Sequence, residues 1–390
     1  MKILYCNPSF WEYRLPFYVE LNRLFKGKFH VLYSTKRYFG SHKNMLSSIK
    51  YAMGDNAHPY DNEWMYVRET HSMKIKDETY HAIPLSFGLF RRIRKVKPDV
   101  LITEGFFQWT PFVQLYGFIF RKPVFVGYER TVYTERNNSK LKTLIRKIQD
   151  KFIAGYLVNG FETRKYLISI GVSPDKILIG GMSADSSKMR KAIADWSDKD
   201  KVSFRRNYIS DDEGLLYLFT GQMILRKGVN FLLDAWREHI VTHSSDKLIL
   251  VGDGEYLKKW KEQYKELSSV FFEGRVNYDD IYKYYGVADV YVLPTIEDNW
   301  SLVIPEAMGC GLPVATSIYN GCHVELVHNG ENGFIFDTYN IQSLISALDS
   351  FHHVNLEEFG RRSISIEKEY NTESCALREY EAILKVVSNG

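Results

Sequence analysis

Two acidic residues and two cations are the candidates for chemistry in this chain. Asp298 and Glu306 are separated by seven residues and flank the loop NWSL, which follows the apolar run VYVLP. Arg226 and Lys227 stand directly before a helical pattern. Carboxylates accept hydrogen bonds from hydroxyl groups, and amides exposed at a helix start bind phosphate. Together these groups suit a sugar nucleotide.

Each of these features also has a simpler explanation. An acid in the first turn of a helix is favourable in itself, which accounts for Glu306 but not for Asp298 or the NWSL loop. Cations at a helix start oppose its dipole at roughly 0.3 to 1 kcal/mol each, so Arg226 and Lys227 fit best if an anion lies between them and the helix amides. They are otherwise ordinary loop residues. Gly252 allows close approach to a ligand or, equally, a tight turn.

The elements that must position these residues are parallel strands alternating with helices. Apolar runs predict strands at residues 2–6, 30–34, 99–105, 123–128, 155–160, 176–181, 215–221, 247–252, 270–274, 289–294, 313–317 and 333–337. Helical patterns lie near 14–26, 89–97, 109–120, 139–152 and 161–170. The pattern predicts an α/β fold with two doubly wound domains, whose ligands lie beyond the carboxyl ends of the strands.

Length and composition agree with this organisation. A chain of 390 residues, 45% hydrophobic and 25% charged, is expected to form about two domains. We predict Rossmann-like domains at 1–195 and 196–365, and a terminal helical segment at 366–390 that packs back toward the first. Residues 41–80 fit the alternation poorly and are predicted to be an inserted excursion.

The expected location is the cytoplasm. Cys6, Cys310, Cys322 and Cys375 show no paired spacing, which argues against a disulfide framework or a zinc site and favours a reducing compartment. No secretory leader pattern opens the chain, and its longest apolar run is about half the length that crosses a bilayer.

Charge is divided unevenly between the two halves. Residues 1–200 hold 33 Lys and Arg against 19 Asp and Glu, and residues 201–390 hold 18 against 28. A basic first half suggests an anionic partner such as phosphate, nucleic acid or an acidic lipid surface. The alternative is a set of scattered, solvated lysines.

The stretch DNWSLVIPEAMGCGLPVATS resembles the acid, seven residues, acid signature of the retaining family 4 glycosyltransferases. The resemblance continues in GQMILRKGVNFLLDAW, LILVGDGEYLKKW, FFEGRVNYDDIYKYYGVADVYVLP and NGCHVELVHNGENGFIF, and covers most of residues 215–337. The first half is similar more loosely, through KPDVLITEG and KPVFVGYE. The resemblance implies a GT-B fold, in which two Rossmann-like domains face a central cleft and the second holds a nucleotide-sugar donor.

The resemblance also implies residue roles. Glu306 would accept hydrogen bonds from the donor's ribose, Asp298 would face the transferred sugar, and Lys227 would neutralise the pyrophosphate. Glu129 follows PVFVGY where many relatives carry a histidine near the sugar. The implied catalytic residues are Asp298, Glu129, Arg226 and Lys227. The implied donor-binding residues are Glu306, Lys227, Arg226, Gly221, Gln222, Gly252, Arg275, Val276, Asn299, Trp300, Ser301 and Leu302. The amides of Asn299, Trp300 and Ser301 would line the donor's pyrophosphate and hydroxyls. The backbone at Arg275 and Val276 would lie against the base.

The chain departs from the family pattern at three places. The first acid of the signature is Asp298, and the adjacent Glu297 reaches the same space with a one-residue shift. Gln222 replaces a frequent arginine, whose charge Arg226 would supply. The glycine-rich loop after the first strand is absent, and CNPSFWEYRLP offers aromatic residues and Arg14 instead.

The expected function is retaining transfer of a sugar, from a UDP- or GDP-linked donor to a glycan or lipid diphosphate-linked acceptor, in the biosynthesis of a bacterial surface polysaccharide such as O-antigen or capsule. No Asp-x-Asp metal signature stands at a strand end, so we expect a cationic clamp, with no metal and no cofactor. The basic runs at 91–97 and 136–147 predict peripheral attachment to the inner face of the membrane, without insertion.

Two other classes remain as alternatives. A GT-B sugar-nucleotide epimerase would share the fold but should carry acid and base residues around the hexose. A nucleic-acid-binding module would use the basic half, although no recognition motif accompanies it, so no nucleic-acid partner is expected.

Overall fold

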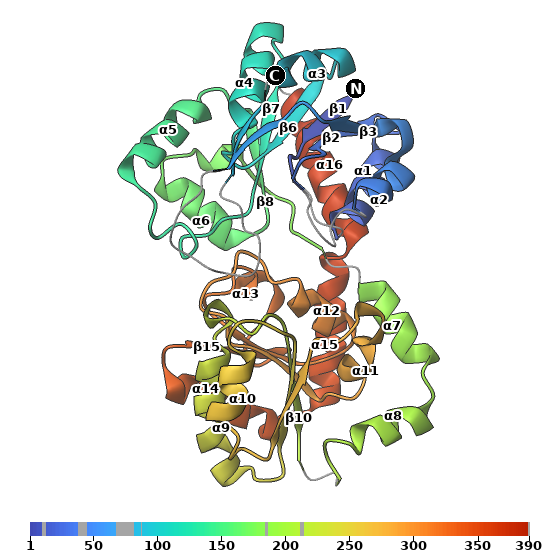
Figure 1. The fold of residues 1–390 in the computed structure, drawn as a ribbon, viewed down its shortest axis with the longest axis vertical. Coiled ribbons are helices and arrows are strands. Elements are labelled where there is room, and N and C mark those ends of the chain that lie inside the picture. Colours follow the sequence, from blue (N-terminus) through green and yellow to red (C-terminus); the bar gives the residue numbers. More distant parts are fainter. Residues whose placement is uncertain are drawn as a thin grey trace.

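Two parallel sheets organise the chain in the computed structural model, which describes residues 1–9, 13–37, 45–67, 82–86, 88–183, 186–210 and 214–388. The first sheet has the strand order β3-β2-β1-β6-β7-β8-β9, and the second has the order β12-β11-β10-β13-β14-β15. Figure 1 shows the sheets one above the other, each covered by helices. The predicted α/β class with two doubly wound domains is confirmed.

The first unit contains the following elements. Its strands are β1 (Ile3–Cys6), β2 (Phe29–Ser34), β3 (Ala57–Tyr60), β6 (Val100–Glu104), β7 (Val124–Tyr128), β8 (Gly155–Val158) and β9 (Ile177–Ile179). Its helices are α1 (Arg14–Leu24), α2 (Met45–Met53), α3 (Leu89–Val96), α4 (Thr110–Phe120), α5 (Lys140–Asp150) and α6 (Phe161–Ser169), with short 3-10 turns η2 (Gly54–Asn56) and η3 (Pro174–Lys176).

The second unit follows the same plan. Its strands are β10 (Leu216–Thr220), β11 (Lys247–Val251), β12 (Val270–Gly274), β13 (Val290–Leu293), β14 (Val314–Ser317) and β15 (Gly333–Phe336). Its helices are α7 (Ser186–Asp195), α8 (Asp198–Arg205), α9 (Val229–Thr242), α10 (Leu257–Gln263), α11 (Tyr282–Tyr285), α12 (Val303–Gly309), α13 (His323–Leu326), α14 (Ile341–Asp349) and α15 (Leu356–Glu369), with the turns η4 (Leu225–Lys227), η5 (Tyr278–Asp280) and η6 (Ser350–His353).

The central strands are buried on both faces, as their continuous apolar sequences predict. Every residue of β7 and β10 is buried. All twelve predicted strands are present. Sequence analysis missed the antiparallel pair described below and also β3, in which Pro59 interrupts the pattern; β3 lies at a sheet edge, where proline is tolerated.

The region 41–80 is an excursion from the alternation, in part outside the described residues. Within the described part, α2 and β3 add to the first sheet, and β4 (Trp64–Val67) pairs antiparallel with β5 (Ala82–Leu85). Residues 41–44 and 68–80 lie outside it. Among the described residues, no helix combines the length and apolar content that crossing a bilayer requires.

The two ends of the second unit make its connections to the first. Helix α7 packs against α11 and α12, so the chain enters the second unit before the predicted boundary at residue 195. The last helix, α16 (Thr372–Ser388), returns to the first unit and packs along α1, where the rings of Phe25 and Tyr380 lie 4.7 Å apart (Figure 1).

Candidate functional site

A cavity of about 530 Å³ lies between the two units, at the carboxyl ends of their strands. It is lined by Tyr13, Glu129, Arg130, Thr134, Met182, Arg226, Lys227, Glu297, Asp298, Asn299, Trp300, Ser301, Leu302 and Val303. The cavity therefore unites all four predicted catalytic residues with the NWSL loop. Sequence analysis missed Tyr13, Arg130, Thr134 and Met182, for which the only signal was proximity to a predicted strand end, and Val303, which follows the NWSL loop.

Gly228 places Lys227 beside the loop that follows β13. Its φ is +69°, and a Cβ built on it would lie 1.9 Å from the carbonyl oxygen of Pro294, so only glycine lets the two loops touch here. The hydroxyl of Thr295 donates to the carbonyl oxygen of Arg226 at 3.0 Å. Because β10 and β13 are neighbours, the cations after one strand lie next to the acids after the other.

Asp298 is the buried acid of the cavity. Its Oδ2 lies 2.6 Å from Nζ of Lys227 and 3.8 Å from Nη1 of Arg226, and it accepts a hydrogen bond from Oγ of Ser301 at 2.5 Å. Burial opposes ionisation, but the Lys227 ammonium and the hydrogen bonds outweigh it and hold the pKa of Asp298 below its ordinary value. At neutral pH Asp298 is thus an ionised carboxylate whose charge is balanced by Lys227.

The adjacent acid, Glu297, has other partners. Its Oε2 lies 2.7 Å from Nη1 of Arg136 in the first unit, and its carbonyl oxygen accepts a hydrogen bond from Arg226 at 2.8 Å. The structure therefore places Asp298, and not Glu297, beside Lys227.

Residues 319–322, to which sequence analysis gave no role in the site, hold the NWSL loop. The amide of Asp298 donates to the carbonyl of Tyr319 at 3.2 Å, and the amide of Gly321 donates to the carbonyl of Asp298 at 3.0 Å. The side chain of Asn320 accepts a hydrogen bond from the amide of Ser301 at 3.3 Å. That amide is therefore hydrogen-bonded within the protein, and its contact with the donor stays a prediction. The Asn-Gly pair was the available sequence signal for this turn.

Glu306 lies in the first turn of α12, outside the lining of the cavity. Burial raises the pKa of Glu306 to about 7, although hydrogen bonds with Tyr285 and Tyr278 act in the opposite direction. A carboxyl group with this pKa is half ionised near neutral pH. Tyr278 closely follows Arg275 and Val276, so the segment predicted to face the base lies near Glu306.

A buried network around Arg14 forms the wall on the first unit. The Arg14 guanidinium pairs with the carboxylate of Glu129 and lies 3.8 Å from that of Glu104, which accepts a hydrogen bond from Tyr5 at 2.5 Å. Burial is the main cause that raises the pKa of Glu104 to about 7, and it does the same for Glu379 on α16. Glu129 is thus an ion-paired residue of the cavity wall.

The remaining predicted residues do not line the cavity, namely Gly221, Gln222, Gly252, Arg275 and Val276. A Cβ on Gly252 would lie 1.8 Å from the carbonyl oxygen of Gly221. This glycine therefore lets two strand-end loops lie in contact, and an approach of its backbone to the donor stays a prediction. Gln222 and Arg275 are exposed, whereas Val276 packs against the core of the second unit.

We expect Gly228→Ala to destabilise the protein more than Gly330→Ala. Both residues have left-handed φ values, +69° and +81°, which cost roughly 1 to 2 kcal/mol for an L-residue. Only at Gly228 does the new methyl group meet the backbone, which adds roughly 1 to 3 kcal/mol; at Gly330 nothing lies within 4 Å. Urea unfolding of both variants measures the difference, and equal free energies of unfolding would contradict this account.

Comparison with known proteins gives a family match for the second unit. Residues 214–353 match the family model described as glycosyl transferases group 1. An uncharacterized glycosyltransferase of Methanocaldococcus jannaschii is 31% identical over 154 residues, which are 39% of this chain and 39% of that protein. The UDP-Gal:alpha-D-GlcNAc-diphosphoundecaprenol alpha-1,3-galactosyltransferase of Escherichia coli is 28% identical over 185 residues, 45% of each chain.

A solved structure extends the likeness to both units, at the level of the fold. The crystal structure of Anabaena Alr3699/HepE in complex with UDP has a TM-score of 0.75 to this structure and 17% identity, and the match covers 99% of this chain and 100% of that one. The two-sheet arrangement is the GT-B fold of such proteins. The chain spans about two fifths of the length of the first two curated relatives that it matches, 39% and 41%.

Proposed function

We propose that this chain moves a sugar from a UDP- or GDP-linked donor to a glycan or lipid-linked glycan, with retention of anomeric configuration. The match of residues 214–353 to the group 1 glycosyl transferase family supports this proposal. The observation that carries the proposal is the pair formed by Lys227 and Asp298 in the cavity between the units, with Arg226 at its side. A sugar diphosphate presents an anion and hydroxyl groups. Lys227 and Asp298, which are hydrogen-bonded to each other, offer it a cation and a carboxylate.

The side chains suit the charge that develops during transfer. As the bond between sugar and pyrophosphate breaks, negative charge grows on the leaving group, and cations held in place beforehand stabilise it. Lys227 is held by Asp298, whereas Arg226 is 41% exposed and supplies the charge that Gln222 lacks. Within the described part of the chain, Oδ1 of Asn299 and Nε1 of Trp300 are buried without a hydrogen-bond partner, and they offer an acceptor and a donor to the sugar.

The same contacts disfavour the epimerase alternative. Epimerisation needs an acid and a base around the hexose that exchange protons during the reaction. The acids of this cavity are ion-paired instead, Asp298 with Lys227, Glu129 with Arg14 and Glu297 with Arg136. Transfer, which needs fixed charges, fits this arrangement better.

Equilibrium binding separates the proposal from the nucleic-acid alternative. We expect saturable binding of UDP or GDP, as the UDP complex of Anabaena HepE suggests, and only weak, salt-sensitive binding of duplex DNA. Tight DNA binding without nucleoside diphosphate binding would refute the proposal.

We further propose that transfer needs no metal, because Lys227 and Arg226 neutralise the leaving group. The expected result is that brief treatment with EDTA leaves turnover within about twofold, and that magnesium or manganese adds nothing. Activity that disappears with EDTA and returns with either metal would contradict the cationic clamp. The physical reason is that fixed side-chain charges perform the role of the ion.

A second cavity is our candidate for the acceptor site. It has a volume of about 540 Å³, lies on the first unit, and shares Arg130 with the cavity described above. Aromatic and basic side chains from the loop after β6 and from α5 line it, among them Phe106, Lys142 and Arg146. We propose that it receives the acceptor, of the lipid diphosphate-linked class named for the E. coli relative, in surface polysaccharide synthesis.

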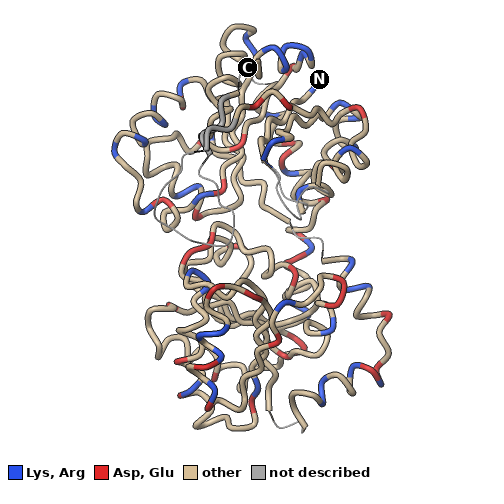
Figure 2. The backbone as a smooth tube through the Cα atoms, in the orientation of Figure 1, with Lys and Arg blue, Asp and Glu red and all other residues tan. Residues whose placement is uncertain are grey.

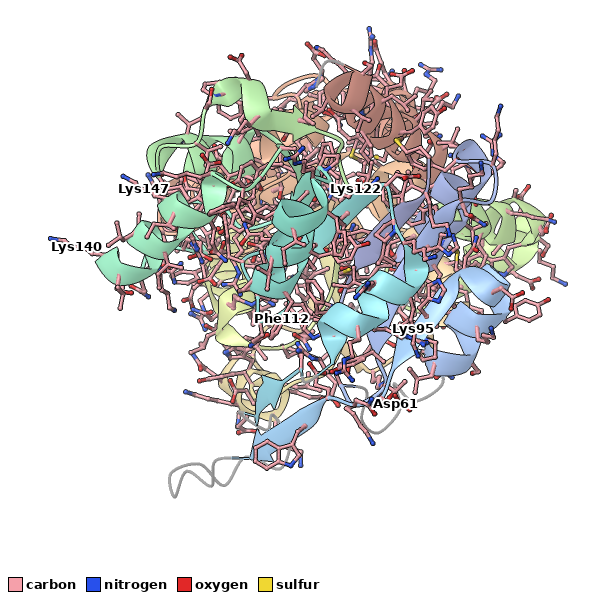
Figure 3. All side chains as sticks on the ribbon, turned by 90° about the horizontal axis from the view of Figure 1, so that it is seen from above. Asp61, Lys95, Phe112, Lys122, Lys140 and Lys147 are labelled. Carbon is pink, nitrogen blue, oxygen red and sulfur yellow. The ribbon has the colours of Figure 1, made fainter. Side chains whose placement is uncertain are left out.

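Helices α4 and α5, next to this cavity, carry an exposed surface that fits an anionic membrane. Its apolar residues, each at least 37% exposed, are Phe112, Leu115, Phe118, Ile119, Phe120, Leu141, Leu144, Ile145 and Ile148 on the two helices, and Phe152 just after α5. Basic residues accompany them on α3 to α5, and Figure 3 shows Lys95, Lys122, Lys140 and Lys147 on this end of the molecule, where Figure 2 shows Lys and Arg in blue. The sequence predicts attachment without insertion, but this many exposed apolar side chains favour shallow burial among the lipid head groups.

We expect the chain to cosediment with vesicles that contain anionic lipid, and less so as salt rises, since each basic residue contributes about 1 kcal/mol near such a surface. Phe118→Glu, on α4, and Leu141→Glu, on α5, should each reduce binding severalfold. Val241→Glu is the matched control, because Val241 is 82% exposed on α9 of the other unit. Equal, negligible sedimentation with anionic and neutral vesicles would contradict membrane attachment.

A further inference from the structure

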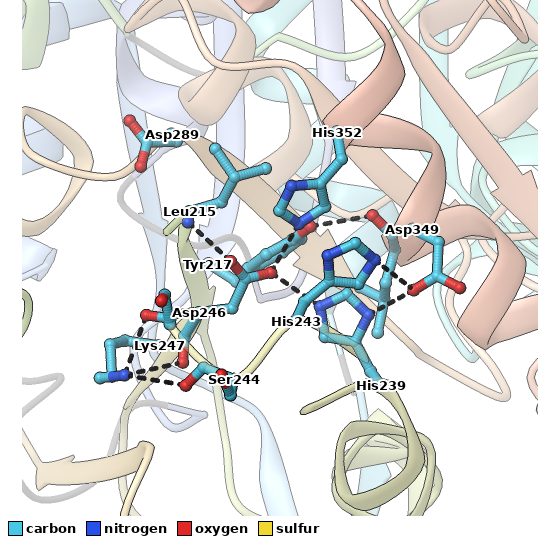
Figure 4. Close-up of polar contacts among 12 residues, drawn as sticks. Leu215, Tyr217, His239, His243, Ser244, Asp246, Lys247, Asp289, Asp349 and His352 are labelled. Atoms are coloured by element: carbon cyan, nitrogen blue, oxygen red, sulfur yellow. Dashed lines mark hydrogen bonds and ion pairs between the residues drawn. The ribbon is translucent and has the colours of Figure 1, made fainter. Parts of the chain in front are cut away.

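A cluster of three histidines and two aspartates lies far from the features described so far, at the amino-terminal edge of the second sheet. His239 belongs to α9, and His243 and Asp246 to the loop that leads into β11. Asp349 ends α14, and His352 lies in η6. Figure 4 shows that these side chains converge. The cavity with Lys227 and Asp298 lies at the carboxyl ends of the same parallel strands, so the cluster is at the opposite edge.

Three atoms of this cluster form a metal-ligand set. Nε2 of His239 and Nε2 of His352 each lie 2.8 Å from Oδ2 of Asp246, and all three atoms lie within 4.8 Å of one another. His239 and Asp246 are each 1% exposed, whereas the His352 side chain is 18% exposed, which leaves a path for an ion to enter. Two imidazoles and one carboxylate suit zinc and related first-row metals.

The groups behind these ligands fix their orientation. Nδ1 of His239 lies 2.5 Å from Oδ1 of Asp349, so a carboxylate supports this histidine from the side away from the ligand set. The other carboxylate oxygen of Asp246, Oδ1, accepts a hydrogen bond from the amide of Leu215 at 2.8 Å. The ring of His243 stacks on that of His352, with centroids 3.8 Å apart and planes at 8°. A carboxylate behind a ligating histidine is typical of protein metal sites, where it sets the tautomer and the ring position.

Charge compensation also favours a divalent ion. The carboxylates of Asp246, which is buried, and of Asp349, whose side chain is 36% exposed, carry two negative charges that two positive charges nearby would balance. One divalent cation supplies both while the histidines stay neutral.

We propose that His239, Asp246 and His352 bind a zinc ion, with water as the fourth ligand. The ion ties α9, the start of β11 and the segment between α14 and α15 together, so its role is to stabilise the second unit. It lies at the opposite edge of the sheet from the proposed transfer site and takes no part in transfer. If the chain binds no zinc, the proposed transfer function is therefore unaffected.

The test uses the full chain without a polyhistidine tag, equilibrated with buffered free zinc. We expect saturable binding of one ion per chain, a higher Tm with zinc, and weaker binding as pH falls, because protons compete for the imidazoles. Asp349→Asn should weaken zinc binding by about 10- to 100-fold, and His352→Ala, which removes a ligand, by at least as much. His353→Ala is the control, because this histidine is the exposed neighbour in sequence and should leave affinity unchanged.

Two results would overturn the proposal. The first is a wild-type chain that shows no saturable zinc binding, which would mean that protons alone bridge the cluster. This measurement decides the question even if a variant fails to fold. The second is zinc affinity that His352→Ala and His353→Ala retain equally, which would place the ion elsewhere.

Discussion

Lys227→Ala should weaken nucleoside diphosphate binding by about 10- to 100-fold, which corresponds to the roughly 1.5 to 3 kcal/mol of a charge-assisted hydrogen bond. It should also lower the free energy of unfolding, because Asp298 then remains buried and loses the ammonium at 2.6 Å. Breaking a buried ion pair costs about 3 kcal/mol or more. Calorimetric titration and urea unfolding measure the two effects separately.

A second substitution distinguishes the two roles of Lys227. In the double variant Lys227→Ala/Asp298→Asn the unpaired charge is gone, so stability should return toward that of the wild type while ligand binding stays weak. Lys258→Ala, which removes an exposed charge on α10 of the same unit, should change neither quantity. If the double variant regained affinity together with stability, Lys227 would be only a partner of Asp298 and not a ligand of the pyrophosphate.

Donor affinity should rise with pH through about 7, and Glu306→Gln should remove that rise. The pKa of Glu306 is raised to about 7 by burial, so the carboxylate to which the family resemblance assigns the ribose hydroxyls forms above this pH. Above pH 7 the variant should bind UDP or GDP about 10- to 100-fold more weakly than the wild type, and below pH 6 the two should approach each other.

The effect on stability runs in the opposite direction to the effect on binding. A carboxyl group whose folded pKa lies above its unfolded value destabilises the folded state once pH exceeds the unfolded pKa. Glu306→Gln should therefore be at least as stable as the wild type at pH 8 while it binds more weakly. The phosphate of the ligand titrates in the same way with both proteins, so it cannot cause a difference between their profiles. Profiles of affinity against pH that have the same shape for the wild type and Glu306→Gln would therefore contradict the ribose assignment.

The strands and most helices follow from the sequence because their signals are local. PVFVGY and LLYLFTG are uninterrupted apolar runs bounded by Gly or Pro, and they form β7 and β10. The cations after β10 and the acids after β13 are adjacent because their strands pair, which a doubly wound sheet already suggests. Edge strand β3, with Pro59, lacks such a signal.

Other parts of the site depend on contacts between residues distant in sequence. The ion pair of Arg14 with Glu129, and the support of the NWSL loop by residues 319–322, require both the strand order and the side-chain conformations. Two explanations stayed open for Gly252 because a glycine that faces a ligand and one that faces another loop look alike in sequence. The ligand set of His239, Asp246 and His352 has no motif spacing, so no pattern search finds it.

The most direct test of the proposed transfer is a donor screen that measures release of nucleoside diphosphate from a panel of UDP- and GDP-linked sugars. The wild-type chain should release nucleoside diphosphate from at least one donor, without added metal, and Lys227→Ala should release it at least tenfold more slowly from the same donor. A wild-type chain that neither binds nor cleaves any member of the panel, or a Lys227→Ala variant that cleaves the donor at the wild-type rate, would contradict the account.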